Sequence, residues 1–425
     1  MIPLSDNSSN YLYRTLDQEL DMLMPYAPAI AIDGPKGVGK TDTASRHADT
    51  VYYLDQVEQQ NIIQADPHLT TAPAGSLLFD EWQYVPEVWN TVRRQVDAGA
   101  PAGRFLLTGS ASPVAGVDTH SGAGRILSLR MRPLAYYERY RPVSPVSLSE
   151  LLLGDMDPIA GQTSQATLAD YFEAIVESGF PGIFQAAPQL RRRLLDAYVQ
   201  RVIDKDLPES GYAVRHPETF RRWLTAYAAA SSTTTSYSRI LDATTAGDGH
   251  QPAKTTTAAY RDFLTKMWLL DPVPGWVPVN NEFAKLAVSP KHQLADPALA
   301  ARLLGLGARG LGTAQGAHMA GPLFESLVTL SVRTAAQAAE GTVSHLRTPK
   351  GDREVDLIVQ GPEGQVMGIE VKLTASVTDA DVRHLLWLRE QAGEAVTNLV
   401  VVTTGSTAYR RTDGVAVVPL ALLAE

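Results

Sequence analysis

The sequence predicts an α/β protein of three parts: a parallel sheet with flanking helices, a helical middle region, and a C-terminal mixed α/β domain. Three observations predict this class. Short apolar runs alternate with a helical segment in residues 1–145, amphipathic helical segments fill residues 146–285, and strand-like runs return in residues 286–425. A chain of 425 residues is also too long for a single hydrophobic core. We therefore expect one domain in each of these three ranges.

The composition is that of an ordinary globular protein, with 44% hydrophobic and 20% charged residues. No apolar run approaches the roughly 18 to 20 residues that span a bilayer, and the N-terminus lacks the basic and apolar segments of a signal peptide. The chain has no cysteine, which excludes disulfides and thiolate zinc sites. We expect a cytoplasmic protein without membrane contact. The net charge of −9 restricts any contact with nucleic acid to a local surface.

The first domain contains four apolar runs that predict buried strands, at residues 28–33, 51–55, 76–80 and 104–109. The apolar residues between the last two runs recur at helical spacing, at Val88, Trp89, Val92 and Val96. Strands that alternate with helices are typical of a parallel sheet. The segment PVSPVSLSE, which ends this region, has the proline and serine content of a domain boundary.

A glycine-rich loop follows the first of these strands and opens a helical segment. Its residues complete the pattern G-x-x-x-x-G-K-[ST], which is typical of the phosphate-binding loop of P-loop NTPases. In such loops the backbone N–H groups surround the phosphates, the lysine reaches the β- and γ-phosphates, and the hydroxyl binds Mg²⁺. The residues expected to bind nucleotide are Gly34, Pro35, Lys36, Gly37, Val38, Gly39, Lys40 and Thr41.

Two carboxylates follow the strand SLLFD. We expect Asp80 to hold magnesium together with Thr41, and Glu81 to orient or deprotonate the attacking water. The alternative is a helix N-terminus, where negative charge is favoured, but this is the weaker interpretation behind a phosphate loop. The next strand ends in small polar groups, and Thr108 or Ser110 can sense the γ-phosphate or position the water.

Arg125, in the segment GAGRILSLR, is a candidate for the positive charge that stabilises the transition state of phosphoryl transfer. It can act within its own chain or from a neighbouring subunit of an oligomer. The alternative is a surface arginine without a catalytic role.

An ordered series of fragments resembles one family. The fragments are YLYR (11–14), GPKGVGKT (34–41), LLFDEWQ (77–83), LLTGSA (106–111), RMRPLAYYE (130–138), SGFP (178–181), RVIDKDL (201–207), SPKHQLAD (289–296), EVDLIV (354–359) and IEVK (369–372). The chain resembles the bacterial and archaeal AAA-type ATPases that carry a C-terminal domain of unknown function, and the resemblance implies ATP binding. It departs from the family at Lys36-Gly37, where arginine and glutamine are usual, and at Asp42, where a second threonine is common. Neither departure touches the groups expected to hold phosphate or metal.

The middle region contains two short helical segments, SYSRILDATT and KTTTAAYRDFLTK, followed by the apolar run LLDPV. This order is typical of a helix-turn-helix with a wing, a motif that binds DNA. A plain helical connector is the alternative interpretation.

The C-terminal segment EVDLIVQGPEGQVMGIEVKL predicts a β-hairpin with a glycine- and proline-rich turn. Side chains alternate between the two faces of a strand. One face is expected to hold Val355, Leu357, Val359, Met367, Ile369, Val371 and Leu373. The opposite face then holds Asp356, Glu370 and Lys372, with Asp356 opposite Glu370 when the turn centres on Glu363. Two carboxylates so close repel each other unless a cation or a proton lies between them.

This hairpin resembles the active-site hairpin of PD-(D/E)XK nucleases. The resemblance implies that Asp356 and Glu370 bind Mg²⁺, that Lys372 stabilises phosphate charge or helps to activate water, and that Glu325 in the preceding helix is a further acidic ligand. The alternative is a solvated face on which Lys372 neutralises the carboxylates.

Three functional hypotheses follow. The first is an ATP-binding and ATP-hydrolysing switch protein that acts on nucleic acid or on a protein partner through its C-terminal domains. The second is an ATP-dependent nuclease that uses the hairpin acids. The third is a non-enzymatic, nucleotide-sensing regulator that binds DNA through a winged helix.

Overall fold

The computed structural model describes residues 11–109, 122–155, 159, 161–209, 211–212, 214, 216–244, 252–276, 289–349 and 351–425. Ser110, one of the expected γ-phosphate sensors, lies outside the described residues. In the described part of the chain, no helix is both long and apolar enough to cross a membrane.

The N-terminal part forms a five-stranded, entirely parallel sheet in the order β2-β3-β4-β1-β5, which confirms the predicted parallel α/β architecture. Its strands are β1 (Ala29–Asp33), β2 (Thr50–Tyr53), β3 (Leu77–Asp80), β4 (Phe105–Gly109) and β5 (Leu127–Arg130). Its helices are α1 (Thr15–Leu23), α2 (Lys40–Arg46), α3 (Val57–Ala65), the 3₁₀ turn η1 (Trp82–Tyr84), α4 (Glu87–Asp97) and α5 (Tyr136–Tyr140).

Both faces of this sheet are covered, as expected for parallel strands with continuous apolar sequences. Ile30 and Ile32 of β1 point to the face that also packs Leu20 of α1. Ala29 and Ala31 of the same strand belong to the opposite core, together with residues of α3 and α4. The parallel strands therefore end at one common edge, and the loop between β1 and α2 lies at that edge.

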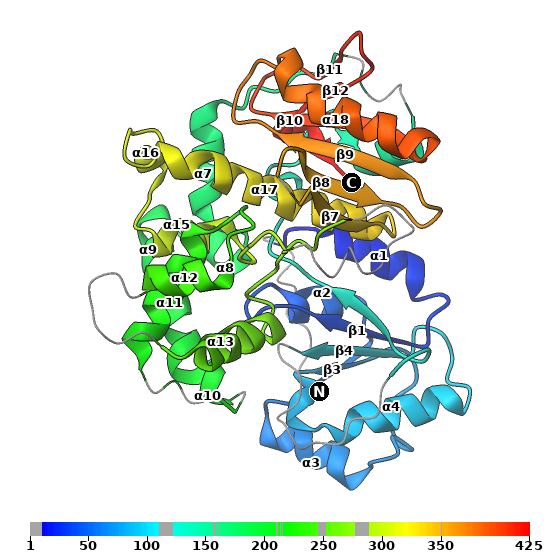
Figure 1. The fold of residues 1–425 in the computed structure, drawn as a ribbon. Coiled ribbons are helices and arrows are strands. Elements are labelled where there is room, and N and C mark those ends of the chain that lie inside the picture. The colour runs from blue at the N-terminus through cyan, green and yellow to red at the C-terminus, as the bar shows by residue number, and fades with distance from the viewer. Residues whose placement is uncertain are drawn as a thin grey trace.

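The middle of the chain is helical, as the sequence predicts. Its elements are α7 (Leu168–Glu177), α8 (Pro181–Phe184), α9 (Pro188–Arg201), the π-helix η2 (Val202–Asp206), α10 (Leu207–Glu209), α11 (Pro217–Ala229), α12 (Tyr237–Thr244), α13 (Lys254–Lys266), α15 (Pro297–Leu303) and α16 (Ala308–Leu311). These helices stand beside both sheets in Figure 1, where their colours run from blue-green through green to yellow.

A short two-stranded ladder follows α13. Leu270 pairs with Leu294 and Val273 with Lys291, both antiparallel. Residues 231–233 lie on the other side of the 291–294 strand, where the backbone N–H of His292 donates to Thr233 O. Helices α11 to α13 followed by this ladder match the order of elements expected for a winged helix, which stays a prediction.

The C-terminal part is a mixed six-stranded sheet in the order β11-β12-β10-β9-β8-β7, as expected for a mixed α/β domain. Its elements are α17 (Ala317–Ala338), β7 (Thr342–Arg347), β8 (Glu354–Gln360), β9 (Val366–Val371), α18 (Asp379–Ala392), η3 (Gly393–Ala395), β10 (Val396–Thr403), β11 (Tyr409–Arg410), β12 (Ala416–Pro419), η4 (Leu420–Leu422) and β13 (Leu423–Ala424). Strands β7 to β9 are antiparallel neighbours, whereas β10 runs parallel to β9 and β12. One face packs on α17 and the other on α18.

Residues that follow the first domain pack on this C-terminal sheet. Strand β6 (Val146–Ser147) pairs with β13 in parallel, and α6 (Leu148–Leu153) lies beside β10. Asn398 Nδ2 donates to Leu151 O at 2.7 Å. One continuous apolar core joins Ile30 of the first sheet, Trp223 of α11 and Leu357 of the C-terminal sheet, so the three parts share a core. The first sheet and the C-terminal sheet each have a second core on the opposite face.

The hairpin of β8 and β9 has the register that the sequence predicts. Leu357 pairs with Ile369 and Val359 with Met367. One detail of the prediction is wrong: Val355 packs with Ile358 in the core under α18, not with Leu357. A bulge causes this, because the pairing of β7 with β8 shifts register between Ser344 and Leu346. A bulge interrupts the alternation of faces and re-aims the neighbouring side chains, here at Asp356.

Candidate functional site

The phosphate loop has the conformation that its glycines allow. Gly37 and Gly39 have φ angles of 78° and 101°, in the left-handed region where a Cβ is strained. At Gly34 a Cβ would lie 2.3 Å from Met131 O, so only glycine fits beside that carbonyl. The loop then leads directly into α2, whose first residue is Lys40.

Lys40 is held by the loop itself. Its Nζ donates to Gly34 O at 2.8 Å and to Pro35 O at 3.0 Å, and the residue is only 6% exposed. Burial lowers the pKa of Lys40 to about 8, against the opposing attraction of the Glu81 and Asp80 carboxylates. Within the described part of the chain, the hydrogen bonds of the amine go to these two neutral carbonyls and no carboxylate forms an ion pair with it.

Asp80 lies at the end of β3 between two hydroxyls. Thr41 Oγ1 donates to Asp80 Oδ1 at 2.7 Å, and Thr108, beside Asp80 on β4, donates to the same oxygen. Burial raises the pKa of Asp80, and the two hydroxyl hydrogen bonds oppose that rise. A hydroxyl and a carboxylate in contact are hard oxygen donors that suit Mg²⁺, so these residues fit the expected ion.

Glu81 follows Asp80 in a left-handed conformation with φ 54°. Such a backbone costs a residue other than glycine about 1 to 3 kcal/mol and is typical of functional sites. Its carboxylate accepts a hydrogen bond from Gln83 Nε2 and is the carboxylate that most strongly attracts Lys40. Glu81 therefore lies beside the phosphate loop, and its role as the base stays a prediction.

Arg125 lies elsewhere. It precedes β5, whose first residue, Leu127, pairs with Ile30 near the start of β1, so Arg125 lies at the sheet edge opposite the phosphate loop. Its side chain is 43% exposed, and its Nε contacts Asp97 Oδ1 at 2.7 Å. The structure therefore does not bring Arg125 to the phosphate loop of its own chain. Arg125 could reach a phosphate loop only in a neighbouring subunit, which stays a prediction.

Arg14, which the sequence analysis did not assign, supports the loop from behind. It is buried, and its Nη1 donates to Val38 O at 3.0 Å. The same guanidinium contacts Glu138 Oε1 at 3.2 Å and Arg132 O at 2.6 Å. A fixed cation behind Val38 therefore anchors the centre of the loop.

The middle region also contacts the loop. Lys36 Nζ lies 2.7 Å from Asp206 Oδ1 at the end of η2, and 3.3 Å from Glu209 Oε2. Tyr198 of α9 donates its hydroxyl to Lys36 O at 3.1 Å. A Cβ at Gly39 would lie 3.6 Å from Pro181. Side chains from α8, α9 and η2 thus cover one side of the loop.

A second contact between the parts centres on Asp271. Arg130, the last residue of β5, and Arg132 just after it lie 2.8 and 3.0 Å from its carboxylate oxygens, and Arg333 of α17 lies at 2.8 Å. Burial would raise the pKa of Asp271, but the three guanidinium groups hold it well below its ordinary value. Asp271 thereby joins the first sheet, the ladder and α17.

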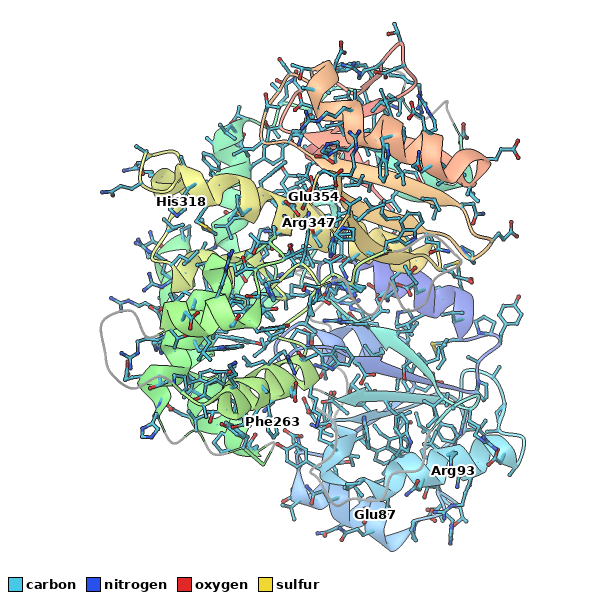
Figure 2. All side chains as sticks on the ribbon, viewed as in Figure 1. Glu87, Arg93, Phe263, His318, Arg347 and Glu354 are labelled. Atoms are coloured by element: carbon cyan, nitrogen blue, oxygen red, sulfur yellow. The ribbon has the colours of Figure 1, made fainter. Side chains whose placement is uncertain are left out.

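The structure brings together the four residues of the second predicted site. Lys372 Nζ contacts Glu370 Oε1 at 2.8 Å, and Asp356 Oδ2 accepts the backbone N–H of Val371 at 2.9 Å. Glu325 faces them from α17. Figure 2 labels Glu354 and Arg347 beside this cluster, and Glu87 and Arg93 on α4 at the other end of the view.

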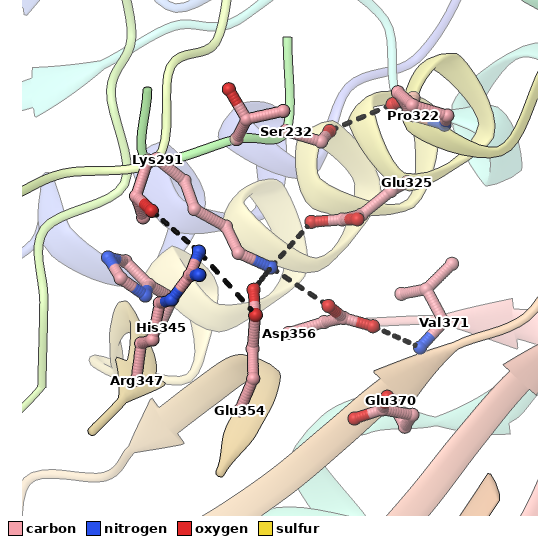
Figure 3. A network of polar contacts seen from close by, with 12 residues as sticks. Ser232, Lys291, Pro322, Glu325, His345, Arg347, Glu354, Asp356, Glu370 and Val371 are labelled. Carbon is pink, nitrogen blue, oxygen red and sulfur yellow. Dashed lines mark hydrogen bonds and ion pairs between the residues drawn. The ribbon is translucent and has the colours of Figure 1, made fainter. Parts of the chain in front are cut away.

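Lys291 occupies the centre of this cluster. Its Nζ lies 2.8 Å from Asp356 Oδ1, 2.9 Å from Glu325 Oε1 and 3.4 Å from Glu354 Oε1 (Figure 3). The side chain is only 1% exposed. This lysine belongs to the fragment SPKHQLAD, and sequence reasoning gave it no role.

The acids of the cluster respond differently to this amine. Burial and the Asp356 carboxylate raise the pKa of Glu325 to about 8, and they raise that of Glu370 to about 8 as well. Burial opposes ionisation of Asp356, but Lys291 holds its pKa below the ordinary value. Among the described residues, no group of three or more His, Asp or Glu is arranged to hold a metal ion. An ammonium group thus supplies the positive charge beside Asp356 and Glu325, and the metal role of Asp356, Glu370 and Glu325 stays a prediction.

Comparison with protein families divides the chain into three segments. Residues 26–140 match the AAA domain family. The chain carries an AAA-type ATPase domain. Residues 168–310 match a domain of unknown function, DUF8612, and residues 320–423 match another, DUF4143. Neither description names a nuclease.

Similar proteins are known in mycobacteria. An uncharacterized protein of Mycobacterium tuberculosis and one of Mycobacterium bovis are each 27% identical over 362 residues, which cover 82% of this chain and 71% of theirs. Among solved structures, a Walker-type ATPase of Pyrococcus abyssi matches 70% of this chain and 97% of its own, with 14% identity and a TM-score of 0.41. The ORC2 protein of Aeropyrum pernix matches 68% and 89%, with 15% identity and a TM-score of 0.27. These two likenesses are too low to carry a functional argument.

Three of the residues that sequence reasoning missed lie in the fragments that resemble the AAA-type family. Arg14 belongs to YLYR, Asp206 to RVIDKDL and Lys291 to SPKHQLAD. Each is a charged residue inside a fragment without an assigned function. A charged residue in such a fragment was the available sign of a functional role, although the sequence did not show which residue each charge would contact.

Proposed function

We propose that this protein is an Mg²⁺-dependent, ATP-hydrolysing switch, whose nucleotide state changes how its helical and C-terminal parts are presented to a nucleic acid or a protein partner. The loop residues 34–41 bind the phosphates, with Lys40 at the β- and γ-phosphates. Thr41 and Asp80 hold the magnesium ion, which neutralises phosphate charge when it is bound. Glu81 takes the proton of the attacking water, and Thr108 positions Asp80.

The observation that carries the switch is the contact of Lys36 with Asp206. Lys36 is part of the phosphate loop, yet its ammonium group is 2.7 Å from a carboxylate of the middle region. Phosphate groups in the loop would compete with that carboxylate for the same cation. Because Tyr198 also binds the backbone of Lys36, a change at this residue acts on both α9 and η2.

The Asp271 cluster gives the switch a second connection. Arg130 ends β5, directly beside the end of β1 from which the loop starts. A movement of this edge acts on Asp271 and thus on the ladder and α17. Two charged contacts therefore connect the nucleotide site to the rest of the chain.

Hydrolysis and coupling are tested separately. Phosphate release from ATP is measured for the full chain, with and without DNA. Hydrogen exchange of residues 198–209 is then compared without nucleotide and with ATP in the Glu81→Gln background. We expect ATP to change exchange in this segment, and we expect Asp206→Asn to remove that change. Asp204→Asn is the matched control, because Asp204 lies in the same π-helix but binds Gln200 instead of the loop.

The switch proposal is wrong if ATP binds and turns over without any change of exchange in residues 198–209. Absence of hydrolysis with ATP bound would leave a nucleotide sensor, the third hypothesis. That hypothesis has one supporting observation, which is the order of three helices and a ladder in residues 217–294.

Duplex binding by the full chain tests the DNA-binding hypothesis. Lys254 and Lys266 are exposed on α13, and their joint replacement by glutamate is expected to weaken duplex binding and lower its salt dependence. Arg93→Glu on α4 is the control. Equal affinity in all three proteins would point to a protein partner.

A further inference from the structure

We propose that Lys291 is the resident cation of the C-terminal carboxylate cluster, so that the cluster excludes divalent metal and instead fastens the middle region to the C-terminal sheet. The cluster consists of Glu325, Glu354, Asp356 and Glu370. The proposal concerns a different site from the phosphate loop and does not depend on ATP hydrolysis.

The position of the amine carries the proposal. Lys291 Nζ lies between Asp356 Oδ1 and Glu325 Oε1, at 2.8 and 2.9 Å (Figure 3). A magnesium ion bound to these two oxygens would lie about 2.0 to 2.1 Å from each. That position falls inside the volume that the ammonium group fills. The amine and the ion therefore exclude each other.

The backbone of Lys291 is fixed on both sides, which makes the amine a built-in part of the site. Its N–H donates to Val273 O, and its carbonyl accepts from Val273 N–H, both at 2.9 Å. The next residue, His292, exchanges backbone hydrogen bonds with residues 232 and 233. The ladder fixes the Cα of Lys291, and the side chain that extends from it into the cluster is only 1% exposed.

Each of the four acids of the cluster already contacts a lysine. Lys291 forms ion pairs with Asp356, Glu325 and Glu354, whereas Lys372 forms one with Glu370. A buried carboxylate stays ionised only beside a cation or a strong donor. A second, divalent cation would therefore have to displace an ammonium group that three carboxylates hold.

The amine also joins two segments of the chain. Lys291 lies in the segment that matches DUF8612, whereas Glu325 and Asp356 lie in the segment that matches DUF4143. The acids that a nuclease would use to bind metal thus bind Lys291 of the ladder here. The ladder also contains Asp271, which forms ion pairs with Arg130 and Arg132.

Iron-directed backbone cleavage of the full chain tests the proposal. Fe²⁺ with ascorbate and peroxide cuts a protein chain close to bound iron, and mass spectrometry locates the cuts. Without nucleotide, the parent should show no cuts near residues 325, 356 and 370. Lys291→Met should gain cuts there, and excess Mn²⁺ should suppress them. Lys291→Arg keeps a cation and should behave like the parent.

The proposal is overturned if the parent is cut at these positions and Asp356→Asn abolishes the cuts, because the site would then hold metal with Lys291 in place. It is equally overturned if folded Lys291→Met gains no cuts. If Lys291→Met does not fold, the double variant Lys291→Met/Glu325→Gln removes one of the stranded charges. This variant should gain cuts near residues 356 and 370, and its failure to do so counts against the proposal.

Discussion

The nucleotide site and the C-terminal cluster both place a buried lysine beside carboxylates at the ends or bends of strands, yet they satisfy that lysine in opposite ways. Among the residues that the structure describes, Lys40 donates to the carbonyls of Gly34 and Pro35, and Asp80 accepts from two hydroxyls. Lys291 contacts three carboxylates directly. The first arrangement pairs charges with neutral dipoles, whereas the second pairs charges with each other.

The difference teaches which site is open to a ligand. A charged group that is hydrogen-bonded to neutral partners is stabilised when a ligand of opposite charge binds, because charge-assisted hydrogen bonds are about twice as strong as neutral ones. In a buried ion pair each charge is already stabilised by the other, and breaking the pair leaves an uncompensated charge. The phosphate loop is therefore ready for an anion and a metal, and the C-terminal cluster is closed to both.

The largest effect is expected at Lys40. Lys40→Ala should weaken ATP binding by about 10³-fold, the range for truncating one partner of a buried charged contact. The fold should be retained, because Lys40 holds only neutral carbonyls. Titration with a fluorescent ATP analogue measures the affinity. Unchanged affinity would contradict the assignment of the phosphate loop.

Replacing Lys291 should lower the stability of the fold and leave ATP binding intact. Lys291→Met should lower the free energy of unfolding by about 3 to 5 kcal/mol, because it strands buried carboxylates. ATP affinity should hardly change. Urea unfolding measures the effect.

Lys372→Met is the matched control for Lys291. The Lys372 side chain is 29% exposed and contacts one carboxylate, whereas Lys291 contacts three, so the loss should be smaller than for Lys291→Met. Equal losses in the two variants would show that Lys291 is no more central to the cluster than Lys372.

Glu81 separates binding from turnover at the open site. Glu81→Gln should leave ATP bound and slow hydrolysis by about 10²-fold or more, as expected for loss of a general base. Single-turnover phosphate release measures the rate. Gln83→Ala is a useful control, since it removes the hydrogen bond to Glu81 without removing the carboxylate. Parent-like turnover in Glu81→Gln would move the catalytic role to another residue.

Glu19 is an intermediate case, a buried acid whose hydrogen-bond partner is an amide. Gln337 Nε2 of α17 donates to both of its oxygens at 3.2 Å, and burial raises the pKa of Glu19 from 4.5 to about 7. A folded-state pKa above the unfolded value means that the folded chain binds the proton more tightly. The stability that Glu19 contributes is therefore complete below pH 4.5 and is lost as the pH rises through 7.

Glu19→Gln should remove this loss. The variant should be more stable than the parent by about 2 to 3 kcal/mol at pH 8, and the difference should shrink toward pH 4.5. Urea unfolding at several pH values gives the difference. A difference that does not depend on pH would contradict the raised pKa.

The sequence by itself determined the local features of this protein. The strand, glycine loop and helix around Lys40 follow from apolar runs and from glycines at positive φ, which are properties of neighbouring residues. The register of β8 with β9 also follows, because one turn fixes it. Asp80 beside Thr41 was predictable, since parallel strands end at one edge of a sheet.

Only the tertiary structure decided which distant charges meet. The pairing of Lys36 with Asp206 and of Lys291 with Asp356 joins residues 170 and 65 positions apart, and no local pattern encodes such a distance. The bulge in β8 also depends on its neighbour β7, so alternation could not place Val355. The acids of the hairpin were found from the sequence, but the cation between them came from another segment, because a buried charge takes the partner that the packed fold brings to it.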